Sequence, residues 1–309
     1  MITYFRFTER SGKSAALNYG LRFAKGEFVI FVDSDTTFDR NAVYNIIMPL
    51  KNPRVGIVSG NLMVRNMDYN LLTALQQIEY LFSISVGRRI RARLGVLPIV
   101  SGAFGAFRKE LISLDKIGGH EPGPGNDSDL TIRVRKLGYK IDFAPDAICY
   151  TTVPEDFYGF IRQRWRWDRN IIKNRVRKHS DVLNPFIKNF RLRDAASSID
   201  SLFYHVVIAS LTVIYLIDAM INFPQVLPLI LIMNYMLYFL AEALQLAIAI
   251  ILTRDMTFSV LFLYMPLFNP YKIILKFFRI IGYIQELFFR YSMYDTFAPY
   301  KVRNRLIKW

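Results

Sequence analysis

Cysteine is almost absent from this sequence, and acidic residues are outnumbered. Cys149 is the only cysteine in 309 residues, which excludes a disulfide framework and a clustered-thiol metal site and predicts a catalytic portion in a reducing compartment. The chain has 25 acidic against 40 basic side chains, a net charge of +15, and 52% hydrophobic content. Such a composition favours an anionic membrane surface or an anionic substrate over DNA.

The character of the chain changes twice along its length. Residues 1–153 alternate short apolar runs with helical patterns, as an α/β domain does. Residues 154–197 are amphipathic and cationic, which predicts helices in the membrane–water interface or docked on the α/β domain. Residues 198–309 are mainly apolar and predict membrane spans. Within the α/β region we expect helices at 14–24, 41–50, 69–93 and 130–137, and strands at 28–32, 55–59 and 141–150. Residues 96–107 form an apolar run that is broken by Gly102 and Gly105.

The run Val29–Asp35 ends an apolar, β-branched stretch with two carboxylates, Asp33 and Asp35. The apolar part predicts a strand buried on both faces, as in a parallel sheet. Ligands bind beyond the carboxyl ends of such strands, and hard oxygen donors suit Mg²⁺ or Mn²⁺ and, through the metal, a diphosphate. The alternative is a solvated turn, since Asp-Ser-Asp is common in turns.

A glycine-rich loop at 123–125 leads into Asn126 and Asp127, and from there into a predicted helix. Asp127 or Ser128 could serve only as the helix N-cap. A carboxylate in this position could also act as a general base that deprotonates a hydroxyl nucleophile.

The string Gln163–Trp167, Gln-Arg-Trp-Arg-Trp, is the most unusual in the chain. On a helix, Gln163, Arg166 and Trp167 share one face because they are three and four residues apart. An amide, a guanidinium and an indole together offer hydrogen bonds, a clamp for phosphate oxygens and a stacking surface for a sugar ring. The alternative is an anchor at the membrane surface.

Residues 202–221 and 226–252 are each long and apolar enough to span a bilayer, and we expect a hairpin. Prolines interrupt 258–289, which could form two short spans, a re-entrant pair, or one span plus an interfacial helix. A compact second pair gives an even number of crossings and leaves the basic tail at 301–308 in the cytoplasm with the catalytic part. Glu242 lies within the second span, where it could line a conduit or pair with a neighbouring helix.

In this order, the motifs resemble those of processive family 2 glycosyltransferases, which include cellulose, hyaluronan, chitooligosaccharide and poly-N-acetylglucosamine synthases. The resemblance covers essentially the whole chain. It rests on the loop bearing Lys13, the Asp33-Ser-Asp35 motif, the segment Ser101–Arg108, Asn126-Asp127, and Gln163-x-x-Arg166-Trp167 followed by membrane spans. It implies an α/β, GT-A-like catalytic domain docked on interfacial helices, with a membrane channel for the growing polymer.

The resemblance also implies a role for each matching residue. Asp127 is expected to be the catalytic base, and Asp35 to hold Mg²⁺ or Mn²⁺. The nucleotide-sugar and diphosphate would be bound by Lys13, Asp33, Asp35 and Arg166. The acceptor would be contacted by Ser101, Gly102, Ala103, Phe104, Gln163 and Trp167.

The implied activity is that of a membrane-bound inverting β-glycosyltransferase in the cell membrane, which elongates a polysaccharide from UDP-glucose or UDP-N-acetylglucosamine and passes it across the bilayer. Its partners are the UDP-sugar, the growing glycan and lipid, and not nucleic acid. Two alternatives remain open. One is a non-catalytic or split-enzyme membrane subunit of a polysaccharide synthase, and the other is a transferase that glycosylates a polyprenyl phosphate.

Two features depart from the family pattern. Asn126 stands where the family usually has Glu, which removes one charge beside Asp127. The family also opens with an acidic nucleotide-binding turn and further α/β structure, whereas residues 1–7 here predict an interior strand. We therefore expect that the N-terminal portion of the catalytic domain is missing and that the chain alone binds UDP-sugar weakly or not at all. Three explanations stay open: a truncated gene product, a fragment, or one part of a split enzyme whose partner subunit supplies the missing portion.

Overall fold

The α/β part of the chain is built on one five-stranded sheet with the strand order β1-β4-β3-β5-β2. The computed structural model describes residues 2–121 and 125–294. Strand β3 runs parallel to β5, and every other pair in the sheet is antiparallel. The strands are β1 (Phe28–Val32), β2 (Thr37–Phe38), β3 (Val55–Val64), β4 (Phe104–Arg108) and β5 (Lys140–Thr151).

Strand β1 forms where the apolar run predicts it, but its surroundings differ from the prediction. It pairs antiparallel with β4 alone and lies at one end of the sheet order. Only Phe31 is buried, and Val32 is 41% exposed. The prediction of a strand buried on both faces in a parallel sheet is therefore wrong, because apolar composition does not encode the direction or the number of neighbouring strands.

Strand β3 is longer than the predicted 55–59 and is buried along its whole length. Its polar residues have partners inside the protein, since Asn61 Nδ2 donates to the carbonyl of Pro145 at 3.0 Å. Gly60 is needed because a Cβ atom there would lie 2.1 Å from the ring of Phe104. The ring of Phe104 can therefore pack directly against Gly60 of β3, where it is fully buried.

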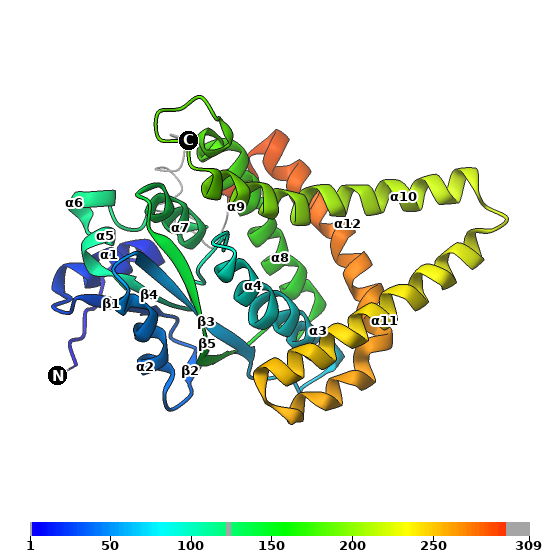
Figure 1. The fold of residues 1–309 in the computed structure, drawn as a ribbon, viewed down its shortest axis with the longest axis horizontal. Helices are drawn as coiled ribbons and strands as arrows, with labels where there is room; N and C mark the ends of the chain where they lie inside the picture. Colours follow the sequence, from blue (N-terminus) through cyan, green and yellow to red (C-terminus); the bar gives the residue numbers. More distant parts are fainter. Residues whose placement is uncertain (1, 122–124, 295–309) are drawn as a thin grey trace.

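Short helices surround the sheet, and a longer interrupted helix runs alongside strands β3 and β5 (Figure 1). The segments α3, η2 and α4 follow one another without a break, with η2 as a π-helical turn, and together confirm the helix predicted at 69–93. The elements are α1 (Lys13–Phe23), α2 (Ala42–Ile47), η1 (Met48–Lys51), α3 (Leu71–Tyr80), η2 (Leu81–Val86), α4 (Gly87–Arg93), α5 (Lys109–Ile112), α6 (Leu114–Ile117) and α7 (Asn126–Lys136).

Residues 2–7 do not form the predicted strand. Ile2 and Tyr4 are 97% and 82% exposed. Phe5 and Phe7 instead pack their rings against Tyr19 of α1 at centroid distances of 5.1 and 5.3 Å. Alternating apolar residues need a neighbouring strand to form a ladder, and among the described residues none pairs with this segment.

Helix α8 (Phe157–Ile171) connects the sheet to the apolar helices. Asp156 caps it by accepting a hydrogen bond from the backbone N–H of Gly159 at 2.7 Å. Trp165 Nε1 donates to the carbonyl of Phe278 at 2.9 Å. A buried cluster that includes Met63, Phe160 and Phe268 joins α8 and the sheet to these helices. The chain then continues through η3 (Ile172–Lys178), η4 (Ser180–Leu183) and α9 (Leu192–Leu202).

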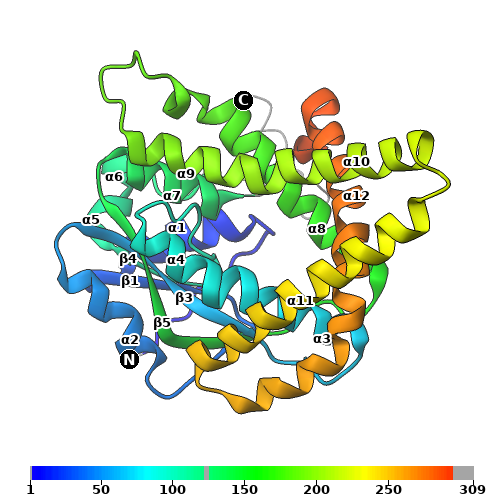
Figure 2. The same cartoon turned by 45° about the vertical axis from the view of Figure 1, so that its right-hand side comes forward.

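Three helical stretches are long and apolar enough to cross a membrane, namely Leu192–Asn222, Leu227–Thr253 and Met256–Phe289. The first two contain the predicted spans and form a hairpin that projects away from the sheet in both views (Figures 1 and 2). Their elements are η5 (Phe203–Val207), α10 (Ile208–Asn222) and α11 (Leu227–Thr253), followed by η6 (Met256–Tyr264), α12 (Met265–Phe289) and η7 (Tyr291–Tyr294).

The third stretch is one continuous helical segment, so the expected compact pair of spans is not formed. Pro266 lies in the first turn of α12, where its missing N–H breaks no hydrogen bond. Pro270 leaves the carbonyl of Pro266 without its usual helical partner, and Tyr235 donates to that carbonyl at 3.1 Å. The basic tail at 301–308 lies outside the described residues.

Glu242 is buried in α11 and pairs with a neighbouring helix. Its Oε1 accepts from Lys272 Nζ of α12 at 2.6 Å. Of the two possibilities for this carboxylate, pairing is the one that the structure contains.

Candidate active site

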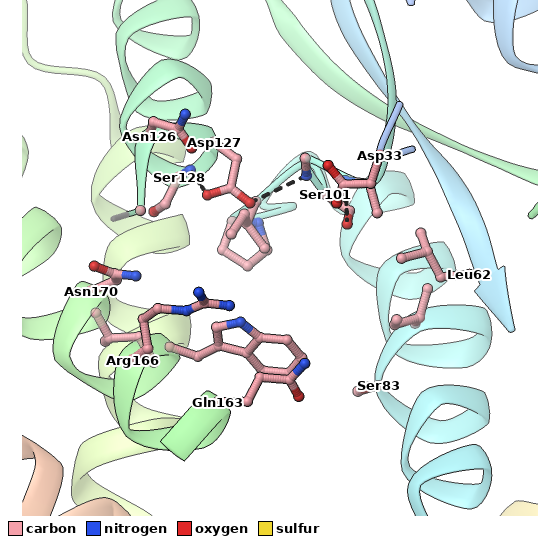
Figure 3. A pocket seen from close by; sticks show the side chains of 18 of the residues that line it. Asp33, Leu62, Ser83, Ser101, Asn126, Asp127, Ser128, Gln163, Arg166 and Asn170 are labelled. Atoms are coloured by element: carbon pink, nitrogen blue, oxygen red, sulfur yellow. Dashed lines mark hydrogen bonds between the residues drawn. The ribbon is translucent and has the colours of Figure 1, made fainter. Parts of the chain in front are cut away.

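A cavity of about 2040 Å³ opens between the end of β1, the start of α7 and helix α8, and extends to α11 and α12. Figure 3 shows part of it, with Asp127 facing the loop at Ser101 and with Gln163 and Arg166 entering from α8. Residues that are far apart in the sequence therefore share one space. The site residues predicted from the sequence that line it are Lys13, Asp33, Asp35, Ser101, Gly102, Ala103, Asp127, Gln163, Arg166 and Trp167.

Phe104 is the predicted site residue that the structure does not bring to this cavity. Its side chain is fully buried, and its ring lies 4.9 Å from that of Phe38. It belongs to the core behind the cavity wall, because it occupies the first position of β4 with its side chain on β3.

Lys13 and Asp33 form an ion pair where β1 ends. Lys13 Nζ also donates to the carbonyl of Gly102 at 3.2 Å. The backbone N–H of Asp33 donates to the carbonyl of Ala103 at 3.3 Å, which holds the end of β1 against the loop before β4. These contacts place one cation and one carboxylate at the position where the sequence predicts the nucleotide-sugar.

Asp35 lies two residues further on, and its side chain is exposed on the cavity. Its backbone carbonyl accepts from Arg65 Nη2 at 2.7 Å, which anchors the turn and leaves the carboxylate to the cavity. Residues 2–121 and 125–294 contain no cluster of three or more His, Cys, Asp or Glu side chains suited to a metal ion. The carboxylate of Asp35 is nevertheless suited to Mg²⁺ or Mn²⁺, because such an ion is commonly bound through only one or two carboxylates, with substrate phosphates and water as its other ligands.

Asp127 lies in the first turn of α7 and is held by two backbone N–H groups. Its Oδ1 accepts from Ser128 at 2.9 Å, and its Oδ2 accepts from Gly102 at 3.2 Å. The interpretation of Asp127 or Ser128 as the N-cap is wrong, because Gly125, with φ 79°, occupies that position. The carboxylate therefore points across the cavity and does not cap the helix.

Asn126, which replaces the family's usual Glu, points away from this carboxylate. Its Nδ2 donates to Ser14 Oγ at 3.0 Å and so joins α7 to α1. A glutamate has no N–H to donate, so this link between the two helices depends on the amide.

Helix α8 presents Gln163, Arg166 and Trp167 to the cavity, as the spacing predicts. Gln163 Oε1 and Asn170 Oδ1 are buried and accept no hydrogen bond from the described residues. Trp167 is 38% exposed, although it belongs to a helix whose other indole, Trp165, is packed on α12. Buried acceptors without partners beside an accessible indole are suited to a ligand rich in hydroxyl groups.

Arg88 is a cavity residue that the motifs do not single out. It extends from α4, and its Nη1 donates to Ser59 Oγ at 2.6 Å. Burial lowers the pKa of Arg88 to about 10, and the charge of Asp127 opposes this shift. At neutral pH the cavity therefore holds a cation near Asp127.

Asp129 is a second residue that sequence reasoning missed, although it lies two positions after Asp127. Its carboxylate accepts from Arg133 and contacts Lys178 and His179 at 2.6–2.8 Å. Burial alone would raise the pKa of Asp129, but these three groups hold it well below its usual range. Asp129 thereby ties α7, which carries Asp127, to η3, which continues α8.

We expect Asp129→Asn to lower the free energy of unfolding by about 3 kcal/mol at pH 7, because it leaves buried cations without a carboxylate. The pKa of Asp129 is depressed in the folded state, so its stabilisation is fully present above its unfolded pKa of about 4 and is lost as the pH falls below it. Unfolding in detergent at pH 7 and pH 3 measures the difference, which should shrink at the lower pH.

Asp181→Asn is the matched control for this prediction. Asp181 pairs with Lys136 at 2.7 Å, but its side chain is 49% exposed. Its loss should cost less than about 1 kcal/mol, because exposed ion pairs are screened by solvent. If both variants lower the free energy of unfolding equally, Asp129 does not hold α7 and η3 together as inferred.

The described residues thus form a GT-A-like fold with a cavity suited to a nucleotide-sugar. Residues 28–275 match the model of the glycosyl transferase family group 2, and the chain belongs to this family. The prediction of a family 2 glycosyltransferase is therefore confirmed.

Relatives and a solved structure agree with this assignment. The chain is 29% identical over 239 residues to a poly-beta-1,6-N-acetyl-D-glucosamine synthase of Staphylococcus epidermidis, covering 76% of this chain and 55% of that protein. It is 29% identical over 170 residues to an N-acetylglucosaminyltransferase of Bradyrhizobium diazoefficiens, covering 53% of this chain and 35% of that protein. The chain spans about half or less of the length of these relatives.

The fold resembles that of a mannosyltransferase from Pyrobaculum calidifontis, solved in complex with GDP-Man and Mn²⁺. The TM-score is 0.54 at 23% identity, and the match covers 91% of this chain and 68% of that one. At this identity the likeness concerns the fold alone, and it confirms the prediction of a GT-A-like domain.

Proposed function

We propose that the protein is a membrane-bound inverting β-glycosyltransferase that elongates a polysaccharide from a UDP-sugar and passes it across the cell membrane. The proposal goes beyond membership of the family because it names the sugar donor, a polymeric product and the route by which that product leaves. The observation that carries the proposal is the shared cavity. Asp127, the Lys13–Asp33 pair with Asp35, and the α8 face with Gln163 and Trp167 all border it.

In this proposal Asp127 acts as the general base. Two backbone N–H groups orient its carboxylate, and it can accept the proton of an acceptor hydroxyl as that oxygen attacks the anomeric carbon of the donor. The bond from the anomeric carbon to the diphosphate breaks in the same step, and UDP leaves. A single in-line displacement inverts an α-linked donor into a β-linked product.

Lys13 and Arg166 supply positive charge for the diphosphate that leaves. A Mg²⁺ or Mn²⁺ ion held by Asp35 would neutralise further charge on the diphosphate when it is bound. Gln163 and Trp167 offer a hydrogen-bonding group and a stacking surface for the acceptor end of the glycan, which supports repeated addition at one site.

The cavity continues beyond Trp167 to Gln245 of α11 and to Lys272 and Lys276 of α12. A path from the α/β domain into the apolar helices supports a polymer that leaves through the membrane part. We place the α/β domain in the cytoplasm, where UDP-sugars are made. The relatives named after N-acetylglucosamine favour UDP-N-acetylglucosamine over UDP-glucose as the donor.

Membranes that contain the protein should be supplied with labelled UDP-N-acetylglucosamine, and in parallel with labelled UDP-glucose, in the presence of Mn²⁺. Long labelled polymer would support the proposal. A single labelled sugar on a lipid would overturn it in favour of a polyprenyl-phosphate transferase. No product from either donor would favour a non-catalytic or split-enzyme subunit.

A further inference from the structure

A chain of side-chain contacts joins helix α12 to the ring of Trp167. Tyr271 of α12 donates its hydroxyl to Glu79 Oε2 of α3 at 2.7 Å. The other oxygen of Glu79 accepts from Arg164 Nη1 of α8 at 2.6 Å. The guanidinium of Arg164 lies over the ring of Trp167 at 4.7 Å from its centroid. Three helices thus meet at one stacking surface.

The side chain of Arg164 is buried between its ion-pair partner and two aromatic rings. Its side chain is 5% exposed, and its guanidinium also lies 4.9 Å from the ring of Phe160, one turn earlier. Its Nε and Nη2 have no hydrogen-bond partner among the described residues, so the ion pair with Glu79 and the two rings hold it in place. A buried planar cation between two aromatic rings has little freedom to rotate.

Trp167, in contrast, is 38% exposed on the cavity. An exposed indole can adopt several rotamers, and a sugar can stack on either face of the ring that is left uncovered. The stacked guanidinium occupies one face of Trp167 and leaves the other for a ligand. Arg164 thereby determines which face of the indole is open, and its own position is held by Glu79 of α3, which in turn is bonded to Tyr271 of α12.

We propose that Arg164 is a positioning residue, which holds the indole of Trp167 in place for the acceptor sugar and, through Glu79 and Tyr271, couples this surface to helix α12. A displacement of α12 would then change how the acceptor end is seated. The acceptor part of this inference rests on the proposed function, whereas the coupling itself does not.

Arg164→Lys keeps the charge for Glu79 but removes the planar stack. In membranes that polymerise, we expect the KM for a short N-acetylglucosamine oligosaccharide to rise about fivefold. The value of kcat and the KM for the donor should stay within about twofold, and products should be shorter. Arg162→Lys, an exposed exchange on the same helix, should leave all of these quantities unchanged.

Tyr271→Phe removes only the hydroxyl that contacts Glu79, and it should raise the KM for the acceptor about threefold. Tyr283→Phe is the matched control, because it also removes one hydroxyl hydrogen bond from α12, to the carbonyl of His205 at 2.7 Å. If the contacts act as a chain, Tyr271→Phe should have no further effect in an Arg164→Lys background. Additive effects would overturn the coupling.

A fluorescence measurement tests the same coupling without relying on activity. With Trp165 and Trp309 replaced by Phe, Trp167 is the only remaining tryptophan of the three. Arg164→Lys and Tyr271→Phe should each raise the acrylamide quenching constant of Trp167 by about twofold, while Tyr283→Phe should not. Unchanged quenching in both variants would overturn the inference. A failure of polymer synthesis with altered quenching would count against the proposed function and not against the coupling.

Discussion

Asp127→Asn is expected to lower kcat for polymer synthesis by about 10³-fold, because general-base catalysis contributes factors of roughly 10² to 10⁴. An asparagine can still accept from the backbone N–H of Gly102, so the loop keeps its position, but its amide cannot take the acceptor proton. The KM for the UDP-sugar should change less than about twofold, since the hydrogen bonds of Asp127 go to the backbone of Ser128 and Gly102 and not to Lys13 or Asp35. Initial rates of labelled-sugar incorporation in membranes measure both quantities.

Asp142→Asn is a suitable control for this variant. Like Asp127, Asp142 accepts a hydrogen bond from the N–H of the next residue, here Phe143 at 2.9 Å. Asp142 belongs to β5 and does not line the cavity. Its substitution should leave kcat unchanged, and a fully active Asp127→Asn protein would disprove the assignment of the base.

The second large effect is expected from Asp35→Ala. Removal of the carboxylate that faces the cavity should lower kcat/KM for the UDP-sugar by about 10²-fold, because bound metal contributes several kcal/mol of charge stabilisation. The concentration of Mn²⁺ needed for half-maximal activity should rise at the same time. Rates measured across a Mn²⁺ series, with the protein first stripped by EDTA, give both values.

Asp146→Ala serves as the control for Asp35→Ala, because Asp146 is an exposed carboxylate outside the cavity. It should respond to Mn²⁺ as the unchanged protein does. Full activity of the unchanged protein in EDTA, or an unaltered Mn²⁺ series for Asp35→Ala, would contradict a metal role for Asp35.

Several parts of the site could be predicted from the sequence because they depend on local geometry. Gln163, Arg166 and Trp167 share a helix face by spacing alone, and the structure brings all three to the cavity. The carboxylates after β1 follow from the end of an apolar run. The helices long enough to cross a membrane follow from length and apolar composition.

Other parts could not be predicted, because they depend on partners far away in the chain. The pairing of β1 with β4 alone, and its antiparallel direction, leave no trace in an apolar run. Pro270 looks like an interruption in the sequence, yet the hydroxyl of Tyr235 accommodates it within one helix. Phe104 carries a motif position but lies in the core, since its strand turns that side chain toward β3.

The sequence by itself determined which chemical groups are present and which of them share a helix face, because spacing along one helix is set by the backbone. Only the tertiary structure decided that Asp127 meets the N–H of Gly102 and that Arg164 is held by Glu79 and Tyr271. Each of these contacts joins residues that are tens of positions apart or more. Such pairs form only when the whole set of buried faces is packed, and periodicity in one segment carries no information about the others.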